Sequence, residues 1–297
     1  MQAVVTLAGE GTRMLPWTRG PRKEFLPLFD RGEGGGPVLK PVAHLVVETL
    51  VRAGADRFTL VVQPKDREFV RGYFAVDRRL LARHRDHEER LTETRRFYRT
   101  LEGLRFHYAV QPRPAGFGDA VLRSRPFVGD APFLLQAGDA VLLEPQRGHV
   151  FGAMARLLER ERLDGVLLVR RVSDPRRYGV IEGTPGPRFE GIRRLDVTTL
   201  VEKPEHPRTH WAATAAYVFR PSLFAALAAF RRAARPRELE LTDGIRTLID
   251  RGGRVSALVL EARWGEWRSV GSPDGFVRAL DRSRRRAARP PVRHPNG

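Results

Sequence analysis

The pattern of apolar and polar positions predicts an alternation of buried strands and amphipathic helices. The chain opens on a short apolar run, residues 3–7, which is typical of a buried strand. Apolar residues then recur at helical spacing over 42–53, and Gly54 is a favourable helix end. A second apolar run follows at 58–62. Strand, loop, helix and strand in this order indicate a βαβ unit, so we expect the two strands to be parallel.

The same alternation continues towards the end of the chain. Residues 66–102 are charged and mostly helical in pattern, whereas 30–37 are rich in glycine and predict a flexible loop. Further strands are predicted at 104–110, 133–136, 165–172, 178–181, 192–195, 212–219 and 255–260, and further helices at 149–162, 222–234, 241–251 and 273–287. This order predicts an α/β fold, in which ligands bind beyond the carboxyl ends of the strands.

Composition narrows the class of protein. The 297 residues include no cysteine, which excludes disulfides, thiolate zinc sites and cysteine nucleophiles. We see no signal peptide and no apolar run of about eighteen residues. We therefore expect a cytoplasmic protein that does not associate with a membrane.

The charge of the chain raises the question of nucleic-acid binding. The net charge is +18, from 53 basic and 35 acidic residues, and the six arginines of 282–297 account for the difference between +18 and +12. Elsewhere basic and acidic residues are interleaved, without the aromatic residues that stack on bases. We expect no specific nucleic-acid binding and a basic surface suited to anionic substrates.

The turn after the first strand has the features of an anion-binding loop. Gly9 and Gly11 flank one residue, which lets the backbone turn tightly and direct its N–H groups towards an anion. Arg13 adds a bidentate phosphate donor. Lys23 follows in the proline-braced segment Pro21-Arg22-Lys23-Glu24. The spacing fits neither the dinucleotide fingerprint nor the P-loop, and a lone Gly-x-Gly is also typical of an ordinary tight turn.

Taken together, Gly9-Glu10-Gly11-Thr12-Arg13 and Pro21-Arg22-Lys23-Glu24 resemble the signature of the sugar-phosphate nucleotidyltransferases. The resemblance continues to about residue 280 and is strongest to the bacterial UTP–glucose-1-phosphate uridylyltransferases, where a base-reading glutamine matches Gln111. It implies an enzyme that transfers a nucleotidyl group from UTP to glucose 1-phosphate. Thymidylyl transfer, another sugar 1-phosphate, or a catalytically weak relative that binds a nucleotide sugar remain the alternatives.

The resemblance also implies roles for individual residues. A second glycine-rich loop, Gly116-Phe117-Gly118-Asp119-Ala120, would lie near the base and ribose, and Val201-Glu202-Lys203-Pro204 resembles the element that binds the sugar and its phosphate. The implied catalytic residues are Arg13, Lys23 and Lys203. The implied nucleotide-binding residues are Ala8, Gly9, Gly11, Thr12, Gln111, Gly116 and Gly118, and the implied sugar-phosphate-binding residues are Gly179, Glu202, Lys203 and Ala215.

Two positions, one at the metal site and one at the sugar site, depart from the family's pattern. Asp139 ends an apolar strand and matches the family's metal-binding aspartate, so we expect it to bind Mg²⁺, the implied cofactor. The family's second aspartate is replaced by Ser269, and Glu266 is the other candidate for the second ligand. Ala215 stands where uridylyltransferases have a sugar-facing glycine, which puts glucose in doubt.

The family also implies the organisation of the chain. We expect a Rossmann-like three-layer α/β/α nucleotidyltransferase domain over 1–281, with a mixed, mostly parallel sheet. Its nucleotide-binding part would span about 1–140 and its sugar-binding part about 141–270, and the domain would carry a small α+β sugar-binding insertion. Residues 282–297 would form a basic, disordered tail. The partners would be a nucleoside triphosphate, a sugar 1-phosphate and further copies of the chain in a dimer or tetramer.

Overall fold

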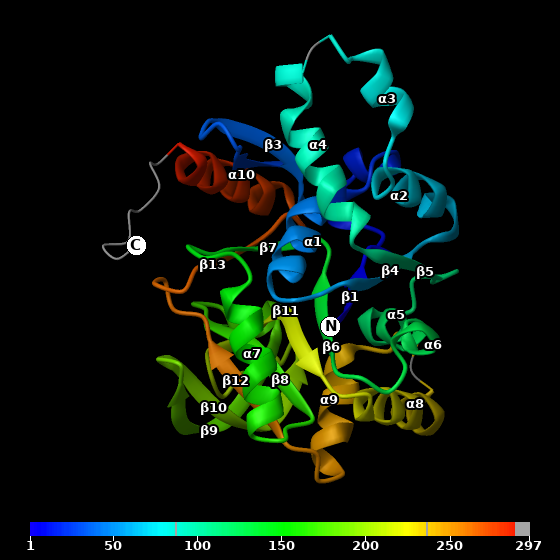
Figure 1. The fold of residues 1–297 in the computed structure, drawn as a ribbon. Coiled ribbons are helices and arrows are strands. Elements are labelled where there is room, and N and C mark those ends of the chain that lie inside the picture. The colour runs from blue at the N-terminus through cyan, green and yellow to red at the C-terminus, as the bar shows by residue number, and fades with distance from the viewer. Residues whose placement is uncertain (87, 236, 289–297) are drawn as a thin grey trace.

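The computed structural model describes residues 1–86, 88–235 and 237–288, and a nine-stranded sheet forms its centre (Figure 1). Neighbouring strands follow the order β5 (Arg105–Val110), β4 (Arg57–Val62), β1 (Gln2–Thr6), β6 (Phe133–Ala137), β11 (Trp211–Phe219), β8 (Gly165–Arg171), β12 (Val255–Val259), β10 (Ile192–Glu202) and β9 (Gly179–Phe189).

The sheet is mixed. β5, β4, β1 and β6 run parallel to one another, as the βαβ pattern predicts. β11 is antiparallel to both β6 and β8, whereas β12 is parallel to β8. β9 and β10 form a long antiparallel hairpin at the edge. Strands from the region 141–270 thus belong to the same sheet as those of 1–140, because β11 joins β6 to β8.

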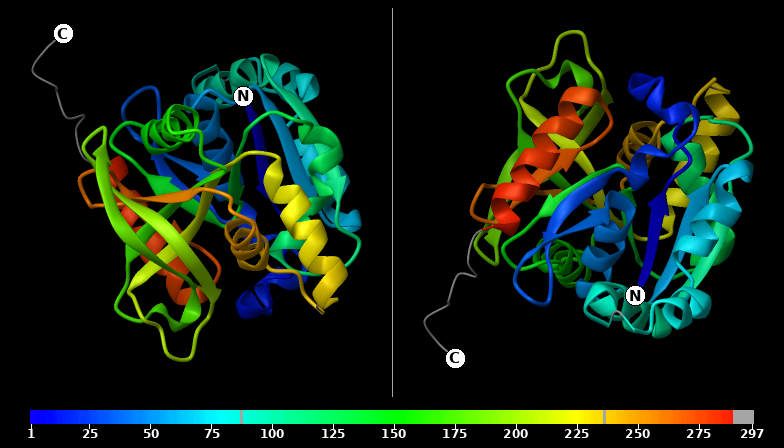
Figure 2. Two further views of the ribbon diagram at one scale, coloured as in Figure 1. Left: turned by 90° about the horizontal axis from the view of Figure 1, so that it is seen from below. Right: turned by 90° about the horizontal axis from the view of Figure 1, so that it is seen from above.

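Helices cover both faces of the sheet (Figure 2). One hydrophobic core receives side chains from α1 (Val42–Arg52), α2 (Arg67–Tyr73), α4 (Glu88–Glu102), α7 (His149–Arg160) and α10 (Pro273–Ala287). The other receives them from α5 (Phe117–Arg123), α6 (Arg125–Val128), α8 (Ser222–Ala234) and α9 (Leu241–Asp250). The remaining helix is α3 (Arg78–Arg83), and 3-10 turns lie at Thr12–Met14, Trp17–Arg19, Lys23–Phe25, Pro64–Asp66 and Pro175–Arg177.

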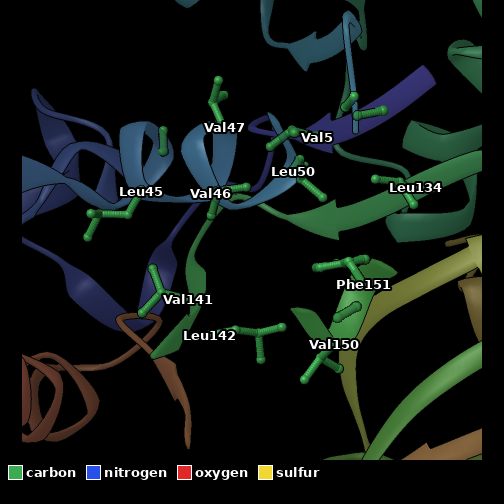
Figure 3. Close-up of a cluster of buried hydrophobic side chains, with 14 of the residues drawn as sticks. Val5, Leu45, Val46, Val47, Leu50, Leu134, Val141, Leu142, Val150 and Phe151 are labelled. Carbon is green, nitrogen blue, oxygen red and sulfur yellow. The ribbon is translucent and has the colours of Figure 1, made fainter. Parts of the chain in front are cut away.

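Alternation along the strands produces the two cores. Val5 of β1 belongs to the core under α1 and α7, whereas its neighbour Val4 belongs to the core under α8 and α9. Successive side chains of a strand point to opposite faces, so a strand covered on both sides must be apolar throughout. Figure 3 shows the first core, where Val46 of α1 and Phe151 of α7 pack near Leu134 of β6. No helix in the described part of the chain has both the length and the apolarity needed to cross a membrane.

Two short ribbons stand beside the main sheet. β2 (Pro27–Arg31) pairs with β3 (Pro37–Pro41), and β7 (Ala140–Leu143) pairs with β13 (Glu266–Ser269). The prediction of a flexible loop over 30–37 is therefore wrong at both ends, since only residues 32–36 lie between the strands. The hairpin is ordered by tertiary contacts, because it packs on α10 and the N–H of Phe29 donates to Ser283 Oγ at 3.1 Å.

Buried charges fasten this hairpin to the rest of the molecule. Lys40 Nζ lies 2.9 Å from a carboxylate oxygen of Asp30 and 2.9 Å from one of Glu48. Arg147 also binds both carboxylates. Burial opposes ionisation of Glu48, but His44, Arg147 and Lys40 hold its pKa well below the usual range. Lys40 therefore pairs with structural carboxylates and not with the anion-binding loop.

The end of the chain is more ordered than composition indicates. α10 continues to Ala287, and the side chains of Ser283 and Ala287 are buried. Residues 282–287 thus belong to a packed helix and not to the expected disordered tail, because Ser283 packs against β2 and Arg286 donates to the carbonyl oxygen of Leu143 in β7 at 2.8 Å. The part of that tail at 289–297 lies outside the described residues.

Candidate functional site

Two loops meet at the carboxyl ends of β1 and β6. These strands are parallel neighbours, so the chain leaves the sheet at the same edge after Thr6 and after Ala137. The loops pack closely, since a Cβ atom at Gly138 would lie only 2.2 Å from Leu7 Cδ2. The glycine loop and Asp139 therefore lie together.

The carbonyl oxygens of the glycine loop, residues 7–13, are largely bound by the protein. Two of them accept hydrogen bonds from Arg22, whose side chain is buried. Among the described residues, the backbone N–H groups of residues 8–11 have no acceptor. The loop thus offers donors to an anion. The carbonyl bonds run from Arg22 to Leu7 and Gly9 (2.7 and 2.8 Å), from Gln63 to Ala8 (2.8 Å) and from Thr18 to Gly11 (2.9 Å).

Lys23 lies against this loop and binds Asp139. Its Nζ would be 3.5 Å from a Cβ atom at Gly9, and it donates to Asp139 Oδ2 at 2.6 Å. Burial alone lowers the pKa of Lys23, but the carboxylates of Asp139 and Glu24 outweigh it and hold the pKa above its usual value. Lys23 is therefore a cation at the edge of the loop. Burial raises the pKa of Glu24 to about 7, although Lys23 opposes this shift.

Asp139, Ser269 and Arg13 converge beside Gly271. A Cβ atom at Gly271 would lie 3.1 Å from Asp139 Oδ2, 3.2 Å from Ser269 Oγ and 3.2 Å from an Arg13 guanidinium nitrogen. Pairing of β13 with β7 sets this arrangement, because Ser269 lies opposite Ala140. The absence of a side chain at Gly271 leaves space among two oxygen ligands and a cation.

Glu266 lies away from this point. It stands opposite Leu143 on the same ribbon and binds Arg268, at 2.6 Å, and Arg282. Burial alone raises the pKa of Glu266, but these two arginines lower it below its usual value. Of the two candidates for a second metal ligand, Ser269 is thus the one beside Asp139.

These oxygens fit a magnesium ion. Within residues 1–86, 88–235 and 237–288, no group of three or more histidine, aspartate and glutamate side chains could hold a metal by itself. Mg²⁺ is commonly held by one or two carboxylates together with substrate phosphates, and it keeps several waters. One carboxylate and one hydroxyl beside an anion-binding loop match that chemistry.

A cavity of about 340 Å³ extends from this point along β11. Such a volume lies at the lower end of the range for small-molecule sites. Six of the residues singled out from the sequence line it: Arg13, Asp139, Gly179, Glu202, Ala215 and Ser269. The structure therefore joins Arg13 of the glycine loop, two of the three metal candidates and three of the four expected sugar-phosphate-binding residues in one cavity.

Glu202 and Lys203 stand at the far end of the cavity. A Cβ atom at Gly179 would lie 3.3 Å from Glu202 Oε2, so the glycine brings the backbone close to that carboxylate. Lys203 Nζ is 3.2 Å from Glu202 Oε1, and its side chain is 60% exposed. Lys203 does not itself line the cavity.

Ala215 adopts a backbone conformation that favours glycine. Its φ is +57°, and it lies in an irregular stretch of β11 between Ala213 and Tyr217, where the register with β8 shifts. Left-handed backbone is costly for a residue with a Cβ atom. The methyl group lines the cavity, so it narrows the space that a glycine would leave.

The second glycine loop packs on the protein. Cβ atoms at Gly116 and Gly118 would lie 2.3 Å from Leu239 O and 2.6 Å from Glu240 O. Gln111 is buried, and its Nε2 donates to Gly116 O at 3.2 Å and to Asp119 Oδ2 at 2.9 Å. None of Gln111, Gly116 and Gly118 lines the cavity, although Phe117 does.

Comparison with known proteins agrees with this geometry. A sequence model described as nucleotidyl transferase matches residues 2–285. The chain belongs to the nucleotidyl transferase family. Membership accounts for the α/β fold.

Three curated relatives of this nucleotidyl transferase have names that describe different activities. The low-salt glycan biosynthesis nucleotidyltransferase Agl11 of Haloferax volcanii is 28% identical over 94% of this chain and 65% of its own length. A glucose-1-phosphate thymidylyltransferase of Streptomyces griseus is 29% identical over 91% and 63%. A UTP–glucose-1-phosphate uridylyltransferase of Mycoplasma pneumoniae is 29% identical over 94% and 90%. The chain thus spans about two thirds of the first two relatives.

Solved structures share the fold of this nucleotidyl transferase. A UDP-glucose pyrophosphorylase complexed with UDP-glucose superposes with a TM-score of 0.79 at 24% identity, covering 96% of this chain and 98% of the other. The UTP-bound enzyme of Acinetobacter baumannii gives 0.79 at 22% identity, covering 95% and 92%. At these identities the likeness concerns the fold.

Sequence reasoning missed several residues of the site. Arg22 stands beside Lys23 in the quoted signature, yet nothing in the sequence shows that it holds the loop carbonyls. Arg170, Tyr178 and Trp267 also line the cavity, and the first lies over the rings of the other two. Trp267 is distant in the sequence from Arg170 and Tyr178, so only the tertiary fold brings it to them.

Proposed function

We propose that this nucleotidyl transferase transfers a nucleotidyl group from a nucleoside triphosphate to a sugar 1-phosphate and releases pyrophosphate. The loop amides of residues 8–11 carry the proposal, because they have no acceptor among the described residues and lie beside Lys23. We propose UTP and glucose 1-phosphate as substrates, in keeping with the name of the Mycoplasma relative.

The chemistry would need positioning and charge stabilisation more than proton transfer. A phosphate oxygen of the sugar 1-phosphate attacks the α-phosphorus in line, a new P–O bond forms, and the bond to the β-phosphate breaks. The attacking oxygen is already anionic, so no general base is required. Holding two mutually repelling anions in line is the main task of the protein.

Different residues of the site would hold the two anions. The loop amides, Arg13 and Lys23 would bind the triphosphate, while Glu202 would bind the sugar and Lys203 its phosphate. Asp139 and Ser269 would hold Mg²⁺, which would neutralise charge on the phosphates. A dication at Asp139 would also compete with the ammonium of Lys23 for Oδ2, leaving that ammonium to a phosphate oxygen.

The test is product formation by the purified protein with UTP, glucose 1-phosphate and Mg²⁺. Pyrophosphate release and the mass of the nucleotide sugar are measured for the wild type and for Lys23→Ala and Lys203→Ala. Loss of a well-placed cation should cost about 3–4 kcal/mol, which is on the order of a hundredfold or more in rate. Lys65→Ala is the matched control, since Lys65 is exposed and lies outside the cavity. Near-full activity in both test variants would reject the assignment.

A second candidate function is binding of a nucleotide sugar with little or no turnover. The observation that favours it is Ser269, because a neutral hydroxyl is a poorer Mg²⁺ ligand than a carboxylate. Calorimetry with UDP-glucose, set beside the turnover assay, separates the two. Micromolar binding without product would support the second candidate over the first.

The base also needs its own test. The Nε2 group of Gln111 is bound by Asp119, so the side chain that matches a base-reading glutamine is engaged within the protein. Thymidylyl transfer is the alternative, in keeping with the name of the Streptomyces relative. A comparison of kcat/KM for UTP and dTTP decides between them, and the proposal expects UTP to be the better substrate.

A further inference from the structure

Four arginines of the cavity have no hydrogen-bond or ion-pair partner among the described residues. The cavity is lined by Arg13, Arg170, Arg177, Arg268 and Arg278. Arg268 binds Glu266 at 2.6 Å. Within the described part of the chain, the side chains of the other four form neither an ion pair nor a hydrogen bond. Arg13 lies at the glycine loop, where the triphosphate would pair with it. The guanidinium groups of Arg170, Arg177 and Arg278 then have no assigned role.

Arg170 is the most constrained of the three. It lies near the end of β8 and is half-buried. Its guanidinium carbon is 4.7 Å from the centre of the Trp267 ring and 5.8 Å from that of Tyr178. Contacts with two aromatic faces hold a guanidinium in place while its N–H groups remain available at the edges. Such a fixed planar donor matches a carboxylate or a phosphate, which it can bind in bidentate fashion.

The carboxylates of the cavity do not satisfy these arginines. Asp139 is bound by Lys23, at 2.6 Å, and Glu202 by Lys203, at 3.2 Å. The third carboxylate, Glu240, caps the first turn of α9. No described carboxylate lies within 4.0 Å of a nitrogen of Arg170. Cationic groups held partly out of water are costly unless an anion accompanies them, so the ligand is the source of the missing charge.

If the sugar of the acceptor is uncharged, the two substrates do not supply the negative charge that these arginines lack. In the proposed function, the triphosphate faces the glycine loop, Arg13 and Lys23, and the phosphate of the acceptor faces Lys203. Arg177, which immediately precedes Tyr178, is exposed and lines the cavity together with Arg170. Of the three arginines without a role, Arg278 lies on α10, whereas Arg170 and Arg177 meet at Tyr178, so these two are the pair left for a further anion on the acceptor.

We propose that the acceptor is a sugar 1-phosphate with a second anionic group, and that Arg170 and Arg177 bind this group. The inference rests on the proposed function and narrows its acceptor from glucose 1-phosphate to an acidic sugar phosphate. The second anion is a carboxylate, as in a uronic acid 1-phosphate, or a second phosphate, as in a sugar bisphosphate. Both present oxygens that a guanidinium fork can bind.

The experiment compares three acceptors with UTP and Mg²⁺. They are glucose 1-phosphate, glucuronic acid 1-phosphate and glucose 1,6-bisphosphate. We expect kcat/KM to be at least about tenfold higher for one of the two acidic acceptors, and the preferred one identifies the second anion. Equal or better turnover of glucose 1-phosphate would overturn the inference while leaving the proposed function intact.

Variants test whether Arg170 and Arg177 cause the preference for an acidic acceptor. Arg170→Gln should lower kcat/KM for the preferred acidic acceptor at least about tenfold more than it lowers kcat/KM for glucose 1-phosphate. Arg177→Gln, at an exposed position where folding is not at risk, should act in the same direction. Arg171→Gln is the matched control, because Arg171 is exposed on the same strand and does not line the cavity. An equal loss for all three acceptors would overturn the inference, since it would assign Arg170 to the shared 1-phosphate.

A binding measurement separates this inference from the proposed function. If no acceptor gives product, the proposed function fails, and calorimetry with each acceptor still tests the arginines. Tighter binding of an acidic acceptor than of glucose 1-phosphate, abolished by Arg170→Gln, would support the site. Equal affinities for all three acceptors would overturn it.

Discussion

Replacing Ser269 by aspartate would place a second carboxylate beside Asp139. Ser269 Oγ and Asp139 Oδ2 lie 3.2 and 3.1 Å from the same point next to Gly271, and the pairing of β13 with β7 fixes both backbones. An aspartate side chain reaches one bond further than serine, so its oxygens would enter the space that Gly271 leaves. The variant would therefore offer Mg²⁺ two carboxylates in place of a carboxylate and a hydroxyl.

The size of the effect follows from the added charge. We expect the Mg²⁺ concentration for half-maximal activity to fall about tenfold, because ligand charge is a main determinant of affinity for hard cations. A tenfold change corresponds to about 1.4 kcal/mol. Without Mg²⁺ the two carboxylates would repel each other by roughly 3–4 kcal/mol at a separation of about 4–6 Å and an effective dielectric constant of about 20. Arg13 and Lys23 would offset part of this repulsion, so we expect a net loss of stability of roughly 1–3 kcal/mol.

The assay is a Mg²⁺ titration of initial rates, with thermal unfolding in EDTA and in Mg²⁺. Ser269→Asn is the matched control, since it has the same shape as aspartate and no charge. We expect Ser269→Asp to unfold at a lower temperature than wild type in EDTA and to recover in Mg²⁺. An unchanged Mg²⁺ requirement, or an equal gain in Ser269→Asn, would refute the placement of the metal between these two side chains.

Three further predictions concern stability. Ala215→Gly should raise the free energy of unfolding in urea by about 1 kcal/mol, because φ is +57° there, and a decrease would contradict this. Burial raises the pKa of Glu24 from 4.5 to about 7, so the folded wild type loses stability as pH rises through that window. Relative to wild type, the free energy of unfolding of Glu24→Gln in EDTA should therefore rise by up to about 3 kcal/mol between pH 5 and 8. A difference that does not depend on pH would argue against this. Gly116→Ala should cost about 4 kcal/mol or more, since its Cβ would lie 2.3 Å from Leu239 O, whereas Gly129→Ala, at φ 64° and ψ −140° with open space, should cost only the backbone strain of about 2–3 kcal/mol; equal losses would exclude the close contact as the cause.

Local patterns predict the parts of the site that lie close together in the sequence. Gly9, Gly11 and Arg13 follow a buried strand directly, so their position at its carboxyl end follows from the strand itself. Asp139 follows another apolar strand, and parallel pairing brings the two ends together. Both placements need only the alternation of the chain and the rule for ligand sites in α/β sheets.

Register and tertiary packing decide the remainder. The choice between Glu266 and Ser269 depends on which residue of β13 stands opposite Ala140, and the spacing in the sequence does not specify that pairing. Gln111 matches a motif by position, but its side chain is bound by Asp119 because the second glycine loop folds over it. Arg170 meets Trp267 only because β8 and the segment after β12 pass the same cavity.

The most direct measurement is a crystal structure of this protein with UTP and Mg²⁺. The account predicts that the phosphates accept hydrogen bonds from the N–H groups of residues 8–11, with Arg13 and Lys23 alongside and the metal ion at Asp139. Phosphates bound at another surface, with the glycine loop unoccupied at saturating UTP, would contradict it.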